Sequence, residues 1–461
     1  MVSWLMPIAV LPKTYTFFFF DSFAQIAVLI FSGFILLKAY MQPKILLTVL
    51  PETRTLKIWG VFITVQLILM TYQSYKLGDS PQIYGLLHGF ISFIQMILVI
   101  WIAYTVQKMV IQKYEDAVKF FKSVIWTFVG YFVLIILPQI LFILGVNGLS
   151  KFINLVAKLF ERHWLDRDFY NLGSYVTTQF RLNGLEPEAS FLALLIGISF
   201  APIILMIIQE PLKTFKRKKY IYWMSLVSML LIMCVLLLAK TTTGLLMIGL
   251  LALIYWVMAS KKQKIWLTIL AAFALLLLVV AYQNVTSIHN LLNNWLFNKS
   301  GTDNRLGGTI GLVGAWFNHP LFGVGYGYEG HYIVQNLPEW SKNNVEYMQV
   351  YKNQSYPILN DLFGWLARFG LVFVLCGAWL LAGLLKRAAH VLRQVSNKQD
   401  EHSVFYRITI KSFFVTVALI IIVAAITPVN ATSWPTLLML FFYWRVIHIA
   451  ENEVFTEESE Q

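Results

Sequence analysis

The stretch DNRLGGTIGLVGAWFNHPLFGVGYGYEG, residues 303–330, is polar and rich in glycine, whereas most of the chain around it is apolar. It lies inside the longest weakly hydrophobic interval of the sequence, residues 283–369. An otherwise apolar chain that gathers polar residues in one interval is expected to carry its chemistry there. We therefore take this stretch as the centre of the predicted functional site.

The composition of the rest of the chain points to a membrane. Of its 461 residues, 58% are hydrophobic and only 13% are charged, and the mean hydropathy is +0.67. Soluble domains carry about 25% charged residues. Runs of about 18 or more apolar residues recur along the chain, which is typical of transmembrane helices and excludes the short alternating strands of an outer-membrane barrel.

The hydropathy pattern predicts an all-α, polytopic membrane protein with about eleven transmembrane helices, all in a single membrane domain, residues 1–461. A twelfth element is expected if residues 1–20 form a hairpin of their own. The predicted spans are 17–37, 58–71, 83–104, 124–144, 191–208, 220–239, 245–259, 265–282, 370–385, 408–426 and 436–449.

The placement of the positive charges predicts the orientation. The net charge of +13 does not indicate nucleic-acid binding, because 20 of the Lys and Arg residues fall in five short intervals that total 69 residues. Two long intervals that total 128 residues hold only 10. This is the positive-inside pattern, so we expect the long intervals and the N terminus outside and the C terminus inside. The short intervals are 38–57, 106–123, 210–219, 261–264 and 386–402, and the long ones are 148–188 and 283–369.

Several smaller features complete the organisation. Residues 108–122 form a basic amphipathic segment that we expect on the inner membrane surface, and KFINLVAKLF at 151–160 predicts an outer interfacial helix. Cys234 and Cys376 lie in apolar spans and are interpreted as packing residues. Asp21, near the start of the first span, is interpreted as interfacial, although an acid inside a membrane would indicate function.

The acidic tail ENEVFTEESEQ, residues 451–461, is predicted to be disordered in the cytoplasm. At 325–330, GYGYEG matches the pattern G-x-G-x-x-G. A dinucleotide site also needs a preceding strand and a βαβ unit, which the sequence does not predict. We interpret the glycines as allowing tight turns or close approach to a ligand. No zinc, P-loop or paired-acid spacing occurs, so we expect no cofactor and no metal site.

Two arginines of the outer intervals stand in weakly charged, glycine-containing contexts, Arg181 in RLNG and Arg305 in TDNRLGG. A guanidinium is permanently charged, and its planar fork suits phosphate oxygens. Two arginines from separate loops could therefore clamp a pyrophosphate. The alternative is that both reach toward lipid headgroups.

These residues resemble the signature of the O-antigen ligase and polysaccharide polymerase superfamily. In that signature an arginine comes before a short amphipathic helix with a tryptophan, and a glycine-containing turn follows. The matching residues are, in order, Arg305, Trp316, His319, Pro320, Gly323, Gly325 and Gly327. Three further segments resemble blocks of the family: RLNGLEPEASFLA at 181–193, as in Gram-positive polymerases, TTTGLL at 241–246 and NDLFGWLARFGLVF at 360–373.

Two departures from the family pattern bear on the reaction. The arginine of the span-opening block is Thr242 in this chain, with Lys240 nearby, and the His-Asn pair of the ligases is Leu359–Asn360. Because that histidine is linked to catalysis in ligases, its absence favours a polymerase. The general base stays open among Glu188, Asp303, His319, His331 and Asp361.

The resemblance implies a metal-independent membrane glycosyltransferase on the outer face of the bacterial plasma membrane. It would join repeat units carried on undecaprenyl pyrophosphate into capsular polysaccharide or exopolysaccharide, with a chain-length regulator as a possible partner. Arginines would stabilise the departing pyrophosphate. The predicted catalytic residues are Arg305, Arg181, Glu188 and His319. The predicted substrate-binding residues are Asp303, Asn304, Trp316, Tyr326, Tyr328, His331, Asn360 and Asp361.

Two alternatives stay open. A ligase would move finished glycan to a lipid or wall acceptor, and a flippase would carry the same lipid-linked sugar across the membrane. Transporters usually show internal repeats and ionisable residues near the bilayer midplane. The sequence shows no repeat, and its polar residues gather in the outer intervals, which favours an enzyme.

Overall fold

The computed structural model describes residues 1–15, 25–78, 80, 83, 85–164, 168–210, 219–286, 289–290, 293, 302–344 and 347–460. Almost every element in these ranges is a helix. The β contact found among them is an isolated bridge between Thr14 and Gln25. The predicted all-α fold is therefore confirmed for the described residues.

Eight helices of the described ranges are long and apolar enough to cross a bilayer, which supports a multi-pass membrane protein. Two shorter apolar helices, α2 (Ile26–Met41) and α13 (Thr242–Met258), cover parts of the first and seventh predicted spans. The eleventh predicted span lies in α21 (Trp434–Glu460), which is outside this group of eight.

Some of the eight contain short π-helical turns, labelled η. The eight are α4 (Thr53–Leu77), α5 (Leu86–Val110), α6 (Tyr114–Tyr131) continued by η3 (Phe132–Ile136) and α7 (Leu137–Ile143), α10 (Ala189–Leu194) continued by η6 (Leu195–Phe200) and α11 (Ala201–Gln209), α12 (Lys219–Leu238), α14 (Lys261–Asn284), α19 (Asp361–Val395) and α20 (Glu401–Ala424).

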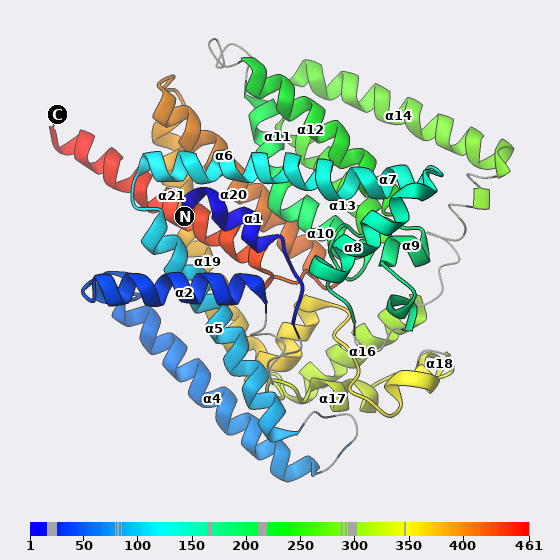
Figure 1. Ribbon diagram of the computed structural model, residues 1–461. Helices are drawn as coiled ribbons and strands as arrows, with labels where there is room; N and C mark the ends of the chain where they lie inside the picture. The colour runs from blue at the N-terminus through cyan, green and yellow to red at the C-terminus, as the bar shows by residue number, and fades with distance from the viewer. Residues whose placement is uncertain are drawn as a thin grey trace.

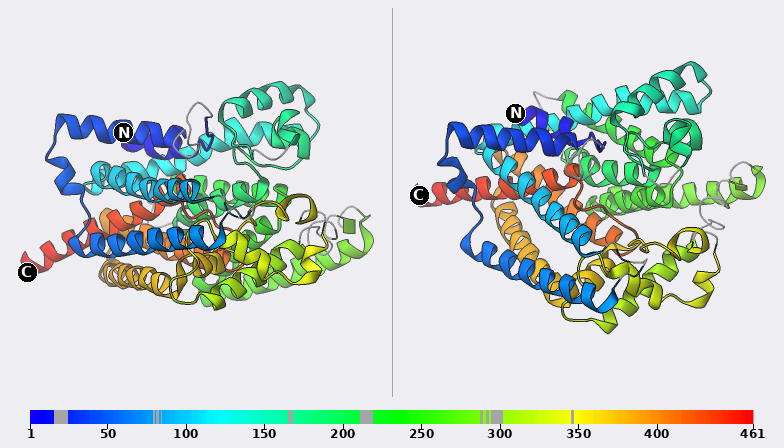
Figure 2. Two further views of the ribbon diagram at one scale, coloured as in Figure 1. Left: turned by 90° about the horizontal axis from the view of Figure 1, so that it is seen from below. Right: turned by 60° about the horizontal axis from the view of Figure 1, so that its bottom comes forward.

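The two long intervals lie at one end of the helices. Figure 1 shows α8 (Ser150–Phe160) and α9 (Tyr175–Gln179) at the right, with α16 (Thr302–Asn318), α17 (Glu329–Gln335) and α18 (Glu339–Lys342) below them. The start of α6, the turn between α19 and α20, and the C terminus lie toward the upper left, and Figure 2 keeps the two groups apart. The basic turns 106–123 and 386–402 therefore lie at the end opposite to the described parts of the long intervals.

Burial separates the helices of the interior from those at the periphery. The run from α10 to α11 is apolar on all sides, and 89% of its most apolar window is buried, as expected for a helix surrounded by protein. It packs against α12 and α20. In contrast, α14 has no buried residue and exposes a row of leucines, which suits a helix that faces lipid.

The prediction that the amphipathic segment 108–122 lies on the inner membrane surface is wrong for its apolar face, which packs on protein. The segment consists of the end of α5, which continues to Val110, a short turn, and the start of α6, which begins at Tyr114. Its apolar side chains Phe120 and Phe121 are buried in the core. The amphipathic pattern arises because one face of α6 packs on protein rather than on the bilayer surface.

The acidic tail is helical where it is described, and so the prediction of disorder is wrong for that part. The helix α21 continues to Glu460. Glutamate has a high helix propensity, and Arg387 of α19 holds the start of the tail through both carboxylate oxygens of Glu451.

The N-terminal residues do not form a hairpin that spans the membrane within the described part. Leu5 and Met6, in α1 (Leu5–Ala9), are fully buried, and α1 packs on α6 and α21. Asp21 lies outside the described residues. The helix predicted at 151–160 is confirmed as α8, which buries Ile153 and Ala157 on one face.

The long helix α19 is broken at Gly370, which has φ 74° and ψ 170°. A break in a helix leaves backbone carbonyls and N–H groups without partners inside the helix, and the loop after α16 binds two of each beside Gly370. The four bonds join Val324 N to Ala367 O (2.8 Å), Gly325 N to Arg368 O (3.1 Å), Leu371 N to Pro320 O (2.8 Å) and Val372 N to Leu321 O (3.0 Å).

Two glycines make this docking possible. A Cβ atom on Gly370 would lie 2.3 Å from the carbonyl oxygen of Leu321, and one on Gly323 would lie 2.5 Å from that of Arg368. Both residues have positive φ angles. The glycine-rich turn that follows α16 is therefore seated directly on the break in α19.

We predict that Gly370→Ala lowers the thermal stability of the purified protein in detergent. The variant must hold an alanine in a conformation reserved for glycine, at a cost of about 1–3 kcal/mol, and must also relieve the contact with Leu321. Gly377→Ala is the matched control, because nothing lies within 4 Å of its added Cβ and its backbone is helical. The control should unfold at or above the wild-type temperature. Equal midpoints for both variants would contradict the proposed docking.

Candidate functional site

Arg305 lies in the first turn of α16, partly buried at the end where the long intervals gather. Its Nη1 donates a hydrogen bond to Oγ1 of Thr427, at 3.3 Å, in the loop between α20 and α21. Within the described part of the chain, its other guanidinium N–H groups have no acceptor. Arg305 is thus held in place by one bond and keeps donors that an anionic ligand could use.

Two other predicted site residues hold the same loop. Asn360 caps α19 and donates from Nδ2 to the carbonyl oxygen of Ala425, at 2.7 Å. The carboxylate of Asp361 accepts a hydrogen bond from the N–H of Val429, also at 2.7 Å. The structure therefore brings Arg305, Asn360 and Asp361 together around the loop 425–430, although Asn360 is only 3% exposed.

The start of α16 is fixed by a second set of contacts. The carbonyl oxygen of Asn304 accepts a hydrogen bond from the hydroxyl of Tyr356 at 2.9 Å, and its side-chain oxygen accepts one from Asn344. Asn304 is 2% exposed, so these contacts give it a structural role, and its substrate-binding role stays a prediction. In contrast, the side chain of Asp303 is exposed, two residues before Arg305.

The aromatic residues of the stretch differ in how accessible they are. Tyr326 is partly exposed, and its ring lies 5.4 Å from that of Phe93. Tyr328 is 1% exposed and packs in the core, so it cannot stack on a sugar in this arrangement. Trp316 has a buried Nε1–H that lacks an acceptor in the described ranges, which is uncommon for a buried donor.

Sequence reasoning missed Arg368 and Glu329, which form an ion pair beneath the glycine-rich turn. The guanidinium carbon of Arg368 also lies 4.3 Å from the centroid of the Tyr326 ring. The second carboxylate oxygen of Glu329 accepts a hydrogen bond from the N–H of Gly327 at 2.8 Å. A single arginine in the apolar run LARFGLVF was the available signal, because such a charge needs a partner.

The predicted histidines lie near the end of α4. The ring of His319 meets Tyr332 edge-on at 4.8 Å, and Nδ1 of His331 lies 3.2 Å from Oγ of Ser80. Burial and then the nearby charge of Lys76 lower the pKa of both histidines, so both are neutral at neutral pH. A neutral imidazole can accept a proton.

His319 and Arg305 do not share one centre. Arg305 lies in the first turn of α16 and His319 directly follows its last residue, so the thirteen residues between them place the two roughly 20 Å apart along the helix axis. Of the five candidate bases, Asp303 is the nearest to Arg305 in the chain, two residues before it. Asp361 contacts the loop between α20 and α21, which Arg305 also contacts. The carboxylate of Asp361 already accepts the N–H of Val429.

The RLNG segment of the first long interval is seated in the helix bundle. The side chain of Gln139 donates to the carbonyl oxygen of Gly184 (2.7 Å) and accepts from its N–H (2.9 Å). Gly184 has φ 61°, and a Cβ there would lie 2.3 Å from the Tyr131 hydroxyl. Arg181 donates at 3.2 Å to the carbonyl oxygen of Lys240, the residue that directly precedes the TTTGLL segment.

The predicted clamp of Arg181 and Arg305 stays a prediction, because each contacts a different loop. Arg181 binds the turn between α12 and α13, whereas Arg305 binds the loop between α20 and α21. Glu188 precedes α10 and is partly exposed. Its carboxylate makes no hydrogen bond or ion pair within the described part, which leaves it available as a base.

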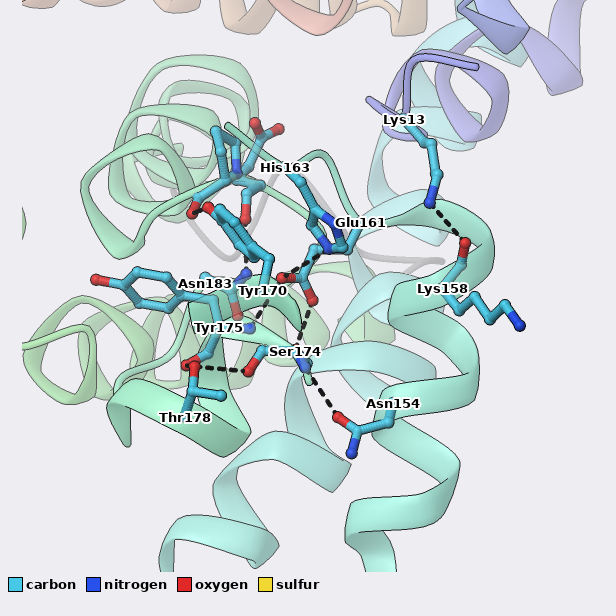
Figure 3. Close-up of polar contacts among 12 residues, drawn as sticks. Lys13, Asn154, Lys158, Glu161, His163, Tyr170, Ser174, Tyr175, Thr178 and Asn183 are labelled. Carbon is cyan, nitrogen blue, oxygen red and sulfur yellow. Dashed lines mark hydrogen bonds and ion pairs between the residues drawn. The ribbon is translucent and has the colours of Figure 1, made fainter. Parts of the chain in front are cut away.

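Next to this segment, Glu161 is a buried carboxylate surrounded by donors (Figure 3). It is 1% exposed and accepts hydrogen bonds from the hydroxyl of Ser174 and from the N–H of Tyr175. Burial raises the pKa of Glu161 to about 7, although these hydrogen bonds act in the opposite direction. His163 lies 3.6 Å from the carboxylate and stacks on Tyr170, and burial lowers the pKa of its imidazole to about 4.

Comparison with known proteins does not assign this site. No family model matches the chain, and no curated protein matches it. A proposal for its function therefore rests on the motifs of the sequence and on the geometry around Arg305.

We predict that Arg368→Met destabilises the protein in detergent by about 3 kcal/mol or more, because it leaves the Glu329 carboxylate buried without its partner. Adding Glu329→Gln to that variant should recover part of the loss, as measured by thermal unfolding. Lys342→Ala is the control, since it also removes a positive charge from an ion pair, but the acid of that pair, Glu339, is 87% exposed. An Arg368→Met variant as stable as this control would contradict the role of the ion pair.

We also predict that the loops around Glu161 lose stability as pH rises toward about 8. The folded pKa of about 7 lies above the ordinary 4.5, so the contribution of Glu161 is fully present below pH 4.5 and is lost as pH rises through 7. His163 acts in the opposite direction, but only below its ordinary pKa of 6.5. Buried Glu186 has a pKa raised to about 7 and shares this window.

The measurement is hydrogen exchange at the Tyr175 amide above pH 6.5, corrected for the intrinsic exchange rate. Wild-type protection should fall with rising pH, and Glu161→Gln should reduce that slope without abolishing it, because Glu186 still titrates. An unchanged slope in Glu161→Gln would show that another group controls these loops.

Proposed function

We propose that this chain is a membrane glycosyltransferase that joins lipid-linked oligosaccharide repeat units into a polysaccharide on the outer face of the bacterial plasma membrane. The observation that carries the proposal is Arg305. It is a partly buried arginine at the end of the helices, with one guanidinium bond to Thr427 and donors left over. A pyrophosphate at the membrane surface has the charge and the oxygen geometry that this group recognises.

The surroundings of Arg305 support the proposal. Both long intervals gather at the same end of the apolar helices (Figure 1). An undecaprenyl tail could therefore stay in the bilayer while its pyrophosphate and sugars reach these intervals. Non-helical backbone at membrane depth is tolerated where it is buried in protein or lines a cavity, and the break at Gly370 is such a place.

The proposed reaction is a displacement at the anomeric carbon of the donor chain. A hydroxyl oxygen of the acceptor repeat bonds to that carbon, the bond from the carbon to the pyrophosphate oxygen breaks, and the hydroxyl proton passes to a protein carboxylate. Arg305 stabilises the charge that the departing pyrophosphate gains, and Arg181 is the second candidate for this role. Asp303 is the preferred base, because it is exposed and lies two residues from Arg305.

We predict that Arg305→Ala abolishes long polysaccharide in the producing strain. Loss of one donor to the developing charge lowers a rate by about 10²–10³-fold in enzymes of known mechanism. Single repeat units should therefore accumulate on the lipid carrier at the outer face, as glycan sizing and lipid extraction would show. Arg305→Lys, which keeps the charge without the planar fork, should retain a fraction of the polymer.

Lys342→Ala is the matched control, because it removes a positive charge at the same end of the molecule from a pair whose acid, Glu339, is exposed. It should leave chain length unchanged. Intact long chains in the Arg305→Ala strain would refute the proposed site. Repeat units trapped at the inner face would indicate transport instead, and finished polymer that fails to reach its lipid or wall acceptor would indicate a ligase.

A further inference from the structure

An open cavity of about 780 Å³ lies at the end of the molecule opposite to Arg305. It is formed by the turn from α2 into α3 (Ile45–Val49), the end of α5 and the middle of α21. Figure 1 shows these parts at the left, toward the C terminus. The lining residues are Gln42, Pro43, Lys44, Ile45, Thr48, Val49, Lys108, Gln112 and Arg445.

A buried arginine without an anionic partner lines this cavity. Arg445 is 8% exposed, and its Nε donates to the carbonyl oxygen of Ile111 at 2.9 Å. Its Nη1 and Nη2 have no acceptor among the described residues. Both atoms face the open cavity, where the oxygens of an anion could accept their hydrogen bonds.

Two further cations reach the same cavity. Lys108 donates from Nζ to the carbonyl oxygen of Leu50 and to the hydroxyl of Tyr104, both at 3.0 Å. Its ammonium and the guanidinium of Arg445 repel each other. Lys44 is exposed at the rim. In the described ranges no carboxylate lines the cavity, and the exposed acid that attracts Lys108 is Glu52.

Apolar surface adjoins this positive charge. Ile45 and Val49 line the cavity, and the neighbouring side chains of α3, Leu46 and Leu47, are 41% and 71% exposed. An anion that also carries hydrocarbon chains would neutralise the cations and cover these leucines together. Basic pockets between membrane helices bind anionic lipid headgroups in this way.

We propose that this cavity binds the phosphate headgroup of an anionic phospholipid from the adjacent leaflet. The phosphate oxygens accept hydrogen bonds from Nη1 and Nη2 of Arg445, with Lys108 and Lys44 on either side. The acyl chains lie along α3. This site lies apart from Arg305 and does not rest on the proposed glycosyltransferase function, so either can fail without the other.

The test is thermal unfolding of the purified, delipidated full chain in detergent with added lipid. Phosphatidylglycerol should raise the midpoint in a concentration-dependent manner, because a ligand of the folded state stabilises it by mass action. Phosphatidylcholine and inorganic phosphate at the same concentrations should not. Lys44 is exposed, so Lys44→Gln should not disturb folding. It should weaken the apparent affinity for phosphatidylglycerol about five-fold, as expected for the loss of one charge near a membrane surface.

Arg445→Gln should remove the phosphatidylglycerol response altogether, and Lys113→Gln is the matched control. Lys113 is 69% exposed at the same end, pairs with Glu115 and does not line the cavity, so its loss should leave the response at the wild-type level. An equal response to phosphatidylcholine or to inorganic phosphate would overturn the assignment to an anionic lipid. A Lys44→Gln response identical to that of the wild type would overturn the site.

Discussion

Four backbone hydrogen bonds join the broken helix α19 to the loop 320–325, at the end of the helices that carries Arg305. In apolar surroundings no water is present to satisfy peptide groups, so a break in a helix is stable only if protein takes over every lost bond. The loop after α16 does this for two carbonyls and two N–H groups beside Gly370. Gly323 and Gly370 are required because any side chain at either position would collide with a carbonyl oxygen.

The docked loop also fixes side chains. The carbonyl oxygen of Arg368 accepts the hydrogen bond from the N–H of Gly325, and its side chain forms an ion pair with Glu329. The Glu329 carboxylate in turn accepts a hydrogen bond from the N–H of Gly327. The loop follows α16 directly, so the same contact orients that helix and Arg305 at its beginning. Asp361, at the start of α19, and Arg305 then meet the loop between α20 and α21.

Some of this architecture could be predicted from sequence, and the limits have physical causes. Apolar runs predict helices well because length and hydrophobicity alone are required for a span. The interpretation of the glycines in GYGYEG as turn residues is confirmed for Gly325 and Gly327, which have positive φ angles, whereas Gly330 lies in α17. The amphipathic pattern at 108–122 led to a wrong prediction for its apolar face, because an apolar stripe looks the same in sequence whether it packs on protein or on a membrane surface. The pairing of Arg368 with Glu329, 39 residues away, depends on the broken helix, which no local pattern shows. Likewise, His319 matches the family motif in sequence order, yet the straight run of α16 places it far from Arg305.

The central claim is that Arg305 and the interval around it perform a glycosyl transfer rather than a transport step. The most direct measurement places the purified protein in liposomes with a single lipid-linked repeat unit and follows the products by gel electrophoresis and mass spectrometry. We expect a ladder of lipid-linked oligomers, with one undecaprenyl pyrophosphate released for each linkage formed. Repeat units that cross the bilayer but remain single would contradict this account.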